Sequence, residues 1–271
     1  IKASYNRLNQ YLHLISNTSS PTPLDIWVPS GPYIKPQKLD QFALGYYTKV
    51  KEVKLESEVF YKKIKNRLDY IDGADLVAND NIETVILPGR SRAYGMELLL
   101  KKNLGRHKYW IAYTLSKSEQ KTPGRNNNEN GINMSKWYNT PYDKTHDFSI
   151  NSEYNINKKL KIVGNFIFQT GQPTNYPNSQ YNYMNLNVPN YGERNSQRLP
   201  NYHRLDINLT LTPNKNDKKI ESSWVFGVYN IYDRDNASSI IFRRNNETLK
   251  NEAVQISIFG IVPSVTYNFK F

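Results

Sequence analysis

The chain has 271 residues, a formal net charge of +12 and no cysteine, which excludes a disulfide framework, a thiolate metal site and a cysteine nucleophile. Its mean hydropathy of −0.72, with no run near the ~18 apolar residues of a spanning helix, excludes a helical membrane protein. A membrane β-barrel is compatible with a low mean hydropathy and no long apolar run. Each of its strands crosses the bilayer in about 9–11 residues, and only every second side chain faces lipid.

Alternating polarity between turn residues predicts ten strands. In chain order they span residues 2–8, 41–49, 54–62, 92–101, 108–117, 147–155, 160–169, 204–212, 223–232 and 259–271. The connections between them alternate strictly between short and long. The short ones lie near residues 50–53, 102–107, 156–159 and 213–222, and the long ones near 9–40, 63–91, 118–146, 170–203 and 233–258.

This alternation predicts an all-β chain that forms part of a transmembrane antiparallel β-barrel. Outer-membrane barrels have short periplasmic turns and long extracellular loops, whereas a soluble sandwich has no reason to sort its connections by length. If Phe271 ends at the periplasmic side, all five long connections are extracellular. We therefore expect the chain to lie in the bacterial outer membrane, in contact with the lipid bilayer.

The predicted strands separate apolar from polar side chains, because successive side chains on a strand point to opposite faces. Leu205 and Leu209 oppose Asp206 and Asn208, for example. A single strand of this kind also fits a half-buried soluble sheet, but the set favours lipid on one face and a polar lumen on the other. The residues predicted to face the lumen are Glu97, Asp147, Asn151, Glu153, Asp206 and Asn208.

The basic residues gather at the short connections. The groups are Lys49, Lys51 and Lys54; Lys101, Lys102, Arg106 and Lys108; Lys158, Lys159 and Lys161; and Lys215, Lys218 and Lys219. On one side of a membrane they would form a ring at head-group level, each worth on the order of 1 kcal/mol. Solvated turn lysines without a partner are an equally open interpretation. Because the charge is spread around turns, we expect no nucleic-acid partner, whose phosphates need clustered Lys and Arg.

The long connections are candidates for a ligand mouth, because loops of this length in a compact domain are usually functional. Their aromatic side chains offer stacking surface for a ligand or anchors at the membrane interface, and both interpretations stay open. These aromatic residues are Trp27, Tyr33, Trp137, Tyr138, Tyr142, Tyr176, Tyr181, Tyr183 and Tyr191.

The acidic stretch at residues 69–83 carries oxygen ligands of the kind Ca²⁺ prefers. Its spacing does not match the EF-hand loop, so turn-forming aspartates are favoured, and calcium binding stays open.

Two histidines lie near aspartates in the sequence, His146 beside Asp147 and His203 near Asp206. These pairs suggest an alternative interpretation, a small outer-membrane protease in which a histidine acts as the general base. Adjacent strand residues point to opposite faces, however, and no serine-centred arrangement follows from the spacing. We expect no catalytic residue, no metal site and no cofactor.

Five stretches together resemble the carboxyl-terminal barrel half of TonB-dependent outer-membrane receptors. They are KASYNR at residues 2–7, SPTPLDIW at 20–27, RAYGME at 92–97, ERNSQRLPNYHRLD at 193–206 and PSVTYNFKF at 263–271. The resemblance covers nearly the whole chain, and its specificity lies in the combination. It implies that the aromatic terminus, Tyr267, Phe269 and Phe271, is read as a signal by the barrel-assembly machinery.

The resemblance further implies a 22-stranded barrel, a plug domain and energy from the inner-membrane TonB complex. Residues 1–271 would be the carboxyl-terminal part of such a barrel, with the plug and about twelve strands supplied by the same or a separate chain. The expected function is import of a scarce ligand, such as an iron chelate, a cofactor, a glycan or a peptide. A protease-like barrel and a passive porin are the alternatives, and a surface lipoprotein partner stays open.

Overall fold

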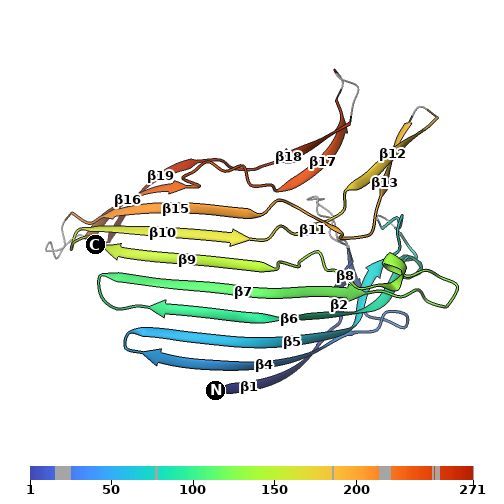
Figure 1. The fold of residues 1–271 in the computed structure, drawn as a ribbon, viewed down its shortest axis with the longest axis horizontal. Helices are drawn as coiled ribbons and strands as arrows, with labels where there is room; N and C mark the ends of the chain where they lie inside the picture. The colour runs from blue at the N-terminus through green and yellow to red at the C-terminus, as the bar shows by residue number, and fades with distance from the viewer. Residues whose placement is uncertain are drawn as a thin grey trace.

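The computed structural model describes residues 1–15, 26–76, 79–184, 186–213, 221–245, 247 and 251–270. One large antiparallel sheet forms the body, and four two-stranded sheets lie in the connections (Figure 1). In these ranges the helical elements are two short 3₁₀ turns, η1 (Ile82–Thr84) and η2 (Ile132–Ser135). No helix in the described ranges has the length and apolar character needed to cross a membrane.

The large sheet contains all ten predicted strands in chain order, which confirms the predicted fold class. The strands are β1 (Lys2–Gln10), β4 (Gln37–Val50), β5 (Val53–Tyr70), β6 (Ile86–Lys102), β7 (His107–Lys121), β9 (His146–Asn155), β10 (Leu160–Gln169), β15 (Tyr202–Leu211), β16 (Glu221–Tyr229) and β19 (Val262–Lys270). A short strand, β8 (Tyr138–Asn139), pairs with β7. The sheet is open, because β1 and β19 each pair with one neighbour only among the described residues.

Short turns lie at one end of the sheet and the long connections at the other (Figure 1). The long connections contain strands that the alternation of the sequence did not predict. They are β2 (Leu12–Leu14) with β3 (Trp27–Pro29), β11 (Pro173–Thr174) with β14 (Gln197–Arg198), β12 (Pro177–Tyr183) with β13 (Leu186–Tyr191), and β17 (Ser239–Arg244) with β18 (Asn251–Ile256). We call the described parts of the long connections the loop layer.

Strand length differs across the sheet. The four strands β4 to β7 have 14 to 18 residues, whereas β9, β10, β15, β16 and β19 have 9 or 10. At about 3.4 Å per residue, β5 spans roughly 60 Å and β10 roughly 34 Å. The extra length of β4 to β7 lies largely at the long-connection end, where β5 continues past its predicted end at residue 62.

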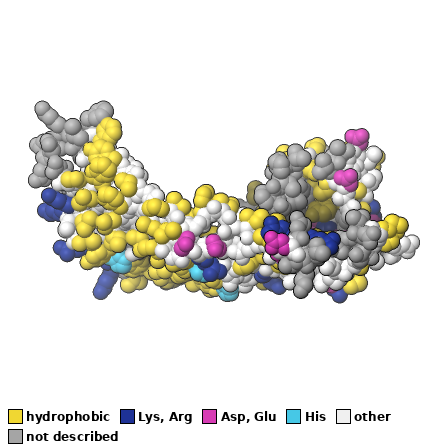
Figure 2. All heavy atoms as spheres, turned by 90° about the horizontal axis from the view of Figure 1, so that it is seen from above, with side chains coloured by type: hydrophobic (Ala, Val, Ile, Leu, Met, Phe, Trp, Pro, Cys, Tyr) yellow, Lys and Arg dark blue, Asp and Glu magenta, His cyan; other side chains and the backbone are white. Residues whose placement is uncertain are grey.

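The strand register sorts side chains onto two faces. Leu209 lies opposite Ile162 and Phe226, and Phe226 lies opposite Val265, so these residues share what we call the apolar face. On this face the middle of every described strand lacks charge, and charges begin towards the long connections, at Asp40, Lys63, Arg92 and Lys117. Figure 2 shows a broad band of hydrophobic side chains along the stranded body, with Lys and Arg at its left end, beside the short turns.

Buried hydrophobic side chains are concentrated in the loop layer rather than along the middle of the sheet. One cluster contains Ile15, Val28, Ile34, Leu68 and Ile86, and a second contains Leu87, Ile132 and Tyr138. The first cluster joins the long-connection ends of β5 and β6 to the 11–36 connection, and the second joins β6 to the 122–145 connection. Apolar burial therefore holds the loop layer in a defined shape at this end of the sheet.

Candidate functional site

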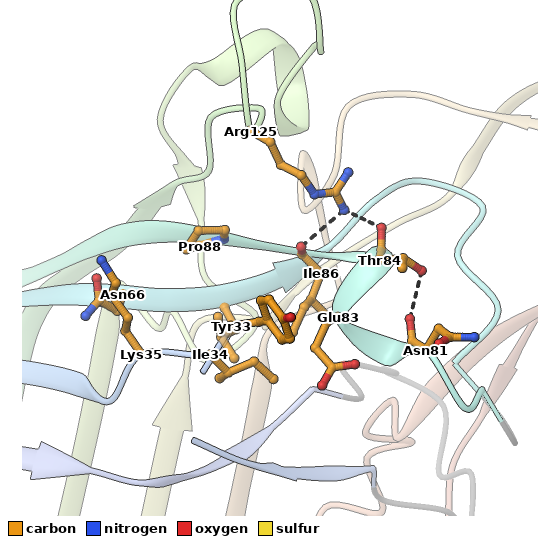
Figure 3. Close-up of a pocket in the computed structure, with 11 residues that line it drawn as sticks. Tyr33, Ile34, Lys35, Asn66, Asn81, Glu83, Thr84, Ile86, Pro88 and Arg125 are labelled. Atoms are coloured by element: carbon orange, nitrogen blue, oxygen red, sulfur yellow. Dashed lines mark hydrogen bonds between the residues drawn. The ribbon is translucent and has the colours of Figure 1, made fainter. Parts of the chain in front are cut away.

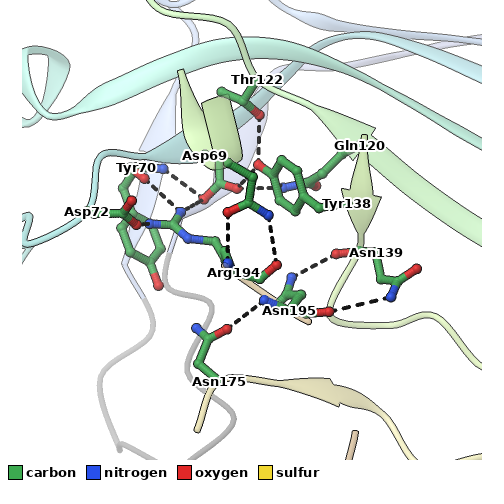
Figure 4. Close-up of polar contacts among 11 residues, drawn as sticks. Asp69, Tyr70, Asp72, Gln120, Thr122, Tyr138, Asn139, Asn175, Arg194 and Asn195 are labelled. Atoms are coloured by element: carbon green, nitrogen blue, oxygen red, sulfur yellow. Dashed lines mark hydrogen bonds and ion pairs between the residues drawn. The ribbon is translucent and has the colours of Figure 1, made fainter. Parts of the chain in front are cut away.

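The loop layer is built around Asp69, a buried carboxylate near the end of β5 (Figure 4). Its Oδ1 accepts a bond from Nη1 of Arg194 at 2.6 Å, and its Oδ2 accepts bonds from Gln120 Nε2 and from the Tyr138 hydroxyl, each at 2.5 Å. The Tyr138 hydroxyl also lies 2.9 Å from that of Thr122. Burial, followed by the charge of Asp69, raises the pKa of Tyr138, so this phenol stays protonated and donates.

Arg194 connects three loops through its side chain and its backbone. Its Nη2 donates to Asp72 Oδ1 at 2.5 Å, Nη1 donates to the Tyr70 carbonyl at 2.7 Å, and the guanidinium lies 4.4 Å from the centre of the Tyr70 ring. Its backbone exchanges two hydrogen bonds with the side chain of Asn133. Burial opposes the charge of Arg194, but Asp69 and Asp72 raise its pKa and keep it cationic. Two carboxylates of the acidic stretch at residues 69–83, those of Asp69 and Asp72, therefore bind Arg194.

A second ion pair fastens the same loop to β7. Asp143 is buried and forms an ion pair with Arg198. It also accepts a hydrogen bond from the backbone amide of Ser118 at 2.6 Å. Arg198 also donates to the carbonyl of Gly171 at 2.9 Å. Within the described residues no three His, Asp or Glu side chains come together in a way that holds a metal ion. These contacts hold the loops of the layer against one another. We call the contacts of Asp69, Arg194, Asp143 and Arg198 the frame of the loop layer.

A cavity with a volume of about 780 Å³ lies at the long-connection ends of β5 and β6 (Figure 3). Arg125 reaches the cavity from the 122–145 connection and donates to the carbonyls of Thr84 and Ile86. Tyr33 lines it with an 85% exposed side chain. The other lining residues are Ile34, Lys35, Asn66, Leu68, Asn81, Glu83, Thr84, Ile86 and Pro88.

A groove of about 520 Å³ lies between the β12–β13 and β17–β18 hairpins. The side chains of Asn251 and Gln180 bond across it, and the Tyr176 ring packs edge-on against Phe242 at 5.5 Å. Arg243, Arg244 and Tyr191 are among its lining residues. The groove therefore combines cationic and aromatic groups at the long-connection end.

The structure separates the nine aromatic candidates into distinct surroundings. Tyr181, Tyr183 and Tyr191 are exposed on the β12–β13 hairpin, and Trp27 and Tyr142 are exposed elsewhere in the loop layer. Trp137 stacks on Arg92, with 4.2 Å between guanidinium carbon and ring centre. Tyr138 differs from the expectation of ligand-stacking surface, because it is buried in the Asp69 network. No sequence signal distinguished it from its neighbour Trp137.

The register places all six predicted polar residues on the face opposite the apolar one. Glu97 lies opposite Thr114, which lies opposite Asp147, and Asn151 lies opposite Asn165, which lies opposite Asp206. Glu153 takes ion pairs from Lys108 and Lys161. Asn208 lies beside Gly227, where an added Cβ would approach its Oδ1 to 2.5 Å. We call this the polar face.

The two histidines considered for a protease do not meet their aspartates. His146 lies on the apolar face, opposite Leu115, with Nδ1 2.9 Å from the Tyr113 hydroxyl. His203 lies opposite Phe168 and has its Nδ1 2.8 Å from the Tyr232 hydroxyl. Asp147 and Asp206 instead bond Gln169 and Arg204 on the polar face. These histidines belong to an aromatic row along the edge of the apolar face.

The terminal aromatic residues Tyr267 and Phe269 lie on the apolar face of β19, with ring centres 5.9 Å apart. Tyr267 also packs against Trp224 of β16 at 4.6 Å. The third member, Phe271, lies outside the described residues, as do residues 20–25 of the resembling stretches. The described part of the terminus thus forms an unbroken aromatic patch.

An open antiparallel sheet with one apolar face, short turns at one end and a braced loop layer at the other defines part of an outer-membrane β-barrel. The family model for TonB-dependent receptor-like β-barrels matches residues 2–231. The chain belongs to this family, and the family places it in the bacterial outer membrane. No curated protein matches the chain.

Solved structures of similar fold include two receptors that are named for ferric ligands. The ferric-catecholate import receptor Fiu of E. coli K12, in a closed form, is 17% identical over 98% of this chain and 32% of its own, with a TM-score of 0.59. The ferripyoverdine receptor of the Pseudomonas aeruginosa outer membrane, bound to ferripyoverdine, is 12% identical over 98% of this chain and 30% of its own, with a TM-score of 0.58. The chain spans about a third of their length, and at these identities the likeness shows the fold.

Proposed function

We propose that the chain forms part of the wall and mouth of an active outer-membrane importer for a scarce ligand, driven by the TonB complex. The observation that carries this proposal is the position of the long connections, which gather at one end of the sheet as a braced layer with a cationic and aromatic groove. A wall whose only task is to span lipid needs no such layer. In this proposal the loop layer is extracellular and the short turns are periplasmic.

The open sheet needs further strands to work in a membrane. Unpaired backbone groups at β1 and β19 would cost several kcal/mol each in hydrocarbon. We therefore propose that further strands and a plug domain, from the same or a separate chain, close the barrel around the polar face. Glu97, Asp147, Asn151, Glu153, Asp206 and Asn208 would then contact the plug or the water of the lumen.

An iron chelate is the first ligand class to test. The named functions of Fiu and of the ferripyoverdine receptor concern ferric chelates, and such chelates commonly carry negative charge. Arg244 beside Tyr191 offers charge and stacking surface for an anionic, aromatic ligand, and Arg243, which pairs with Glu252 at 2.9 Å, is the second cation of the groove. A cofactor, a glycan or a peptide stays in the proposal as the next class.

The experiment measures uptake of a panel of ferric chelates in cells that carry the complete barrel protein. Replacing residues 177–191 with a short linker removes the β12–β13 hairpin and leaves Arg194 and Arg198 in place, so the frame is kept. We expect uptake to fall at least tenfold in this variant and to stop when the inner membrane is de-energised. The control K158Q/K159Q alters the short β9–β10 turn at the other end of the sheet and should import normally.

Two outcomes would replace the proposal. Passage of solute without an energised inner membrane would identify a passive pore. Hydrolysis of a peptide or ester by the purified barrel, lost on changing His146 or His203 to Ala, would identify an enzyme. We expect no hydrolysis, because both histidines bond tyrosine hydroxyls.

A further inference from the structure

A second cavity, of about 590 Å³, opens at the long-connection end of the apolar face and is lined by cations. Lys65, Arg90 and Lys121 come from β5, β6 and β7 and lie side by side in one rung of the sheet. Lys63 lines the cavity from the next rung. The remaining lining residues are Asn66, Pro88, Gly89 and Pro123, so no acidic side chain lines it. Asn66 and Pro88 also appear in Figure 3.

These four cations are not neutralised by the described part of the chain. The carboxylates nearby on the same face are already paired, Asp40 with Arg7 and Glu119 with Arg92 and Lys117. None of Lys63, Lys65, Arg90 and Lys121 belongs to an ion pair among the described residues. Lys63, Lys65 and Arg90 are exposed. A cavity with several unpaired cations and no acid is suited to a multiply charged anion.

The position of the cavity relative to lipid narrows the identity of that anion. Towards the long connections, Lys63 lies two residues beyond Tyr61 and Lys65 lies four residues beyond it, steps of about 7 and 14 Å along β5. Tyr61 and Tyr94 stack at 6.4 Å, and Tyr5 packs on Phe42 at 5.0 Å in the same aromatic row. Such rows mark the level where hydrocarbon meets head groups. The cavity therefore lies at head-group height and faces outwards, away from the polar face.

The cavity also has a preformed edge. Trp137 lies over both Arg92 and Arg90, with 4.2 and 5.6 Å between each guanidinium carbon and the ring centre. Arg92 already pairs with Glu119. At Arg90, which forms no ion pair among the described residues, stacking restricts the guanidinium and leaves its edge donors available to bind an oxyanion. At Gly89 an added Cβ would approach the Lys121 carbonyl to 2.6 Å, so close strand packing helps to place Lys121 beside Arg90.

We propose that this cavity binds the phosphorylated head group of an outer-leaflet lipid, as a site separate from the ligand mouth. The phosphate is held by Arg90, Lys65, Lys121 and Lys63, and the acyl chains lie along the aromatic row below. The site does not depend on the proposed import function, because it faces the bilayer and not the lumen.

The test uses the complete barrel protein in phosphatidylcholine nanodiscs that contain a small fraction of phosphatidic acid, whose head group is a phosphate monoester. Native mass spectrometry measures retained phosphatidic acid. The variant K65Q/R90Q/K121Q should retain at least tenfold less than the unaltered protein. The control K49Q/K51Q/K54Q removes the same charge at the β4–β5 turn and measures the general attraction between turn lysines and anionic lipid. It should retain at least fivefold more phosphatidic acid than K65Q/R90Q/K121Q, with folding of both checked by heat-modifiable mobility.

Three results would overturn the proposal. Equal losses in the two triple variants would show general attraction between a basic protein and an anionic membrane. Normal retention by K65Q/R90Q/K121Q would show that the cavity is not the site. Displacement of phosphatidic acid by inorganic phosphate at the same concentration would identify a site for free phosphate. If the triple variant does not fold, Arg90→Lys is used instead. It keeps the positive charge but loses the bidentate guanidinium, and it should lower retention of phosphatidic acid at least threefold.

Discussion

At the scale of single residues, the frame of the loop layer depends on one buried charge pair. The side chains of Arg194 and Asp69 are 7% and 2% exposed, so neither charge is compensated by water. A buried pair is poor evidence of net stabilisation, but removing one partner leaves the other charge isolated at a cost of about 3–5 kcal/mol. The pair therefore specifies which loops meet, more than it adds stability.

Arg194→Met tests this frame. We expect the variant to loosen the connections that Arg194 joins, because Asp69 and Asp72 lose their shared cation. Hydrogen exchange of the segments 69–76 and 186–201 should increase at least tenfold, while exchange in β9 and β10 stays unchanged. The double variant D69N/R194M removes both charges and should recover part of the protection. Unchanged exchange in the single variant would contradict the assigned role.

His13 provides a pH-dependent contact in the same layer. It is fully buried in β2, with Nε2 2.8 Å from Ser30 Oγ and Nδ1 2.9 Å from the Gln37 amide nitrogen. Burial, followed by the charge of Arg67, lowers the pKa of His13 from its ordinary value of 6.5. The unfolded segment therefore takes up a proton more readily than the folded one.

The contribution of His13 to stability is accordingly complete above about pH 6.5 and declines as the pH falls towards the lower folded pKa. We expect proteolysis within residues 26–36 to be several-fold faster at about pH 5.5 than at about pH 7.5, after correction for protease activity. His13→Gln cannot titrate and should flatten this dependence. A dependence that is equally steep in the variant would assign the effect to another group.

At the scale of elements, the sequence predicts a strand well where one face meets lipid. The alternation of Leu205, Ile207 and Leu209 with polar residues is strict, and β15 falls within two residues of its predicted bounds. The upper part of β5 was missed, because Lys63, Lys65 and Arg67 resemble a polar loop. Asn66 adds to this, with φ of 58° and a register shift beside it that breaks the period of two.

The candidate site was less predictable than the sheet. Asp69 and Arg194 are 125 positions apart and meet only because two loops fold over the same strand ends. Tyr176, Tyr181 and Tyr191 were identified as loop aromatics, but the hairpins that carry the latter two show no clear alternation. A local sequence pattern does not predict contacts between loops that are far apart in the chain. The frame and the groove were therefore found only in the tertiary structure.

The apolar face gives a prediction at this scale. Leu209→Arg places a charge between Ile162 and Phe226, in the uncharged band of the sheet, at an expected cost of about 2–4 kcal/mol near the midplane. We expect a strong loss of heat-modifiable folded barrel in membranes. Asn208→Arg, one residue away on the polar face, is the matched control and should assemble far better. Equal tolerance of both changes would refute the lipid-facing assignment.

At the scale of the whole molecule, the open sheet has to be completed, inserted and closed. Tyr267 and Phe269 stand on the apolar face of β19, the last strand and one edge of the sheet. An aromatic end at this position is suited to recognition by the assembly machinery, as the family resemblance implies. We therefore propose that the terminus acts in barrel assembly.

Changing Phe271 to Asp should therefore lower the amount of protein in the outer membrane several-fold while synthesis stays unchanged. Quantitative immunoblots of outer-membrane and whole-cell fractions measure both quantities. Lys270→Gln alters the neighbouring polar-face position and serves as the control. Normal outer-membrane levels of the Phe271 variant would count against a role in assembly.

The unequal strand lengths have a consequence for the outer surface of the cell. Hydrocarbon is about 30 Å thick, which β10 nearly matches, whereas β5 is roughly twice as long. In the proposed orientation, strands β4 to β7 therefore extend further beyond the hydrocarbon than β9, β10, β15, β16 and β19 do. Antibodies raised against whole cells would then find regular strand surface in this sector, where the shorter strands offer only their connections.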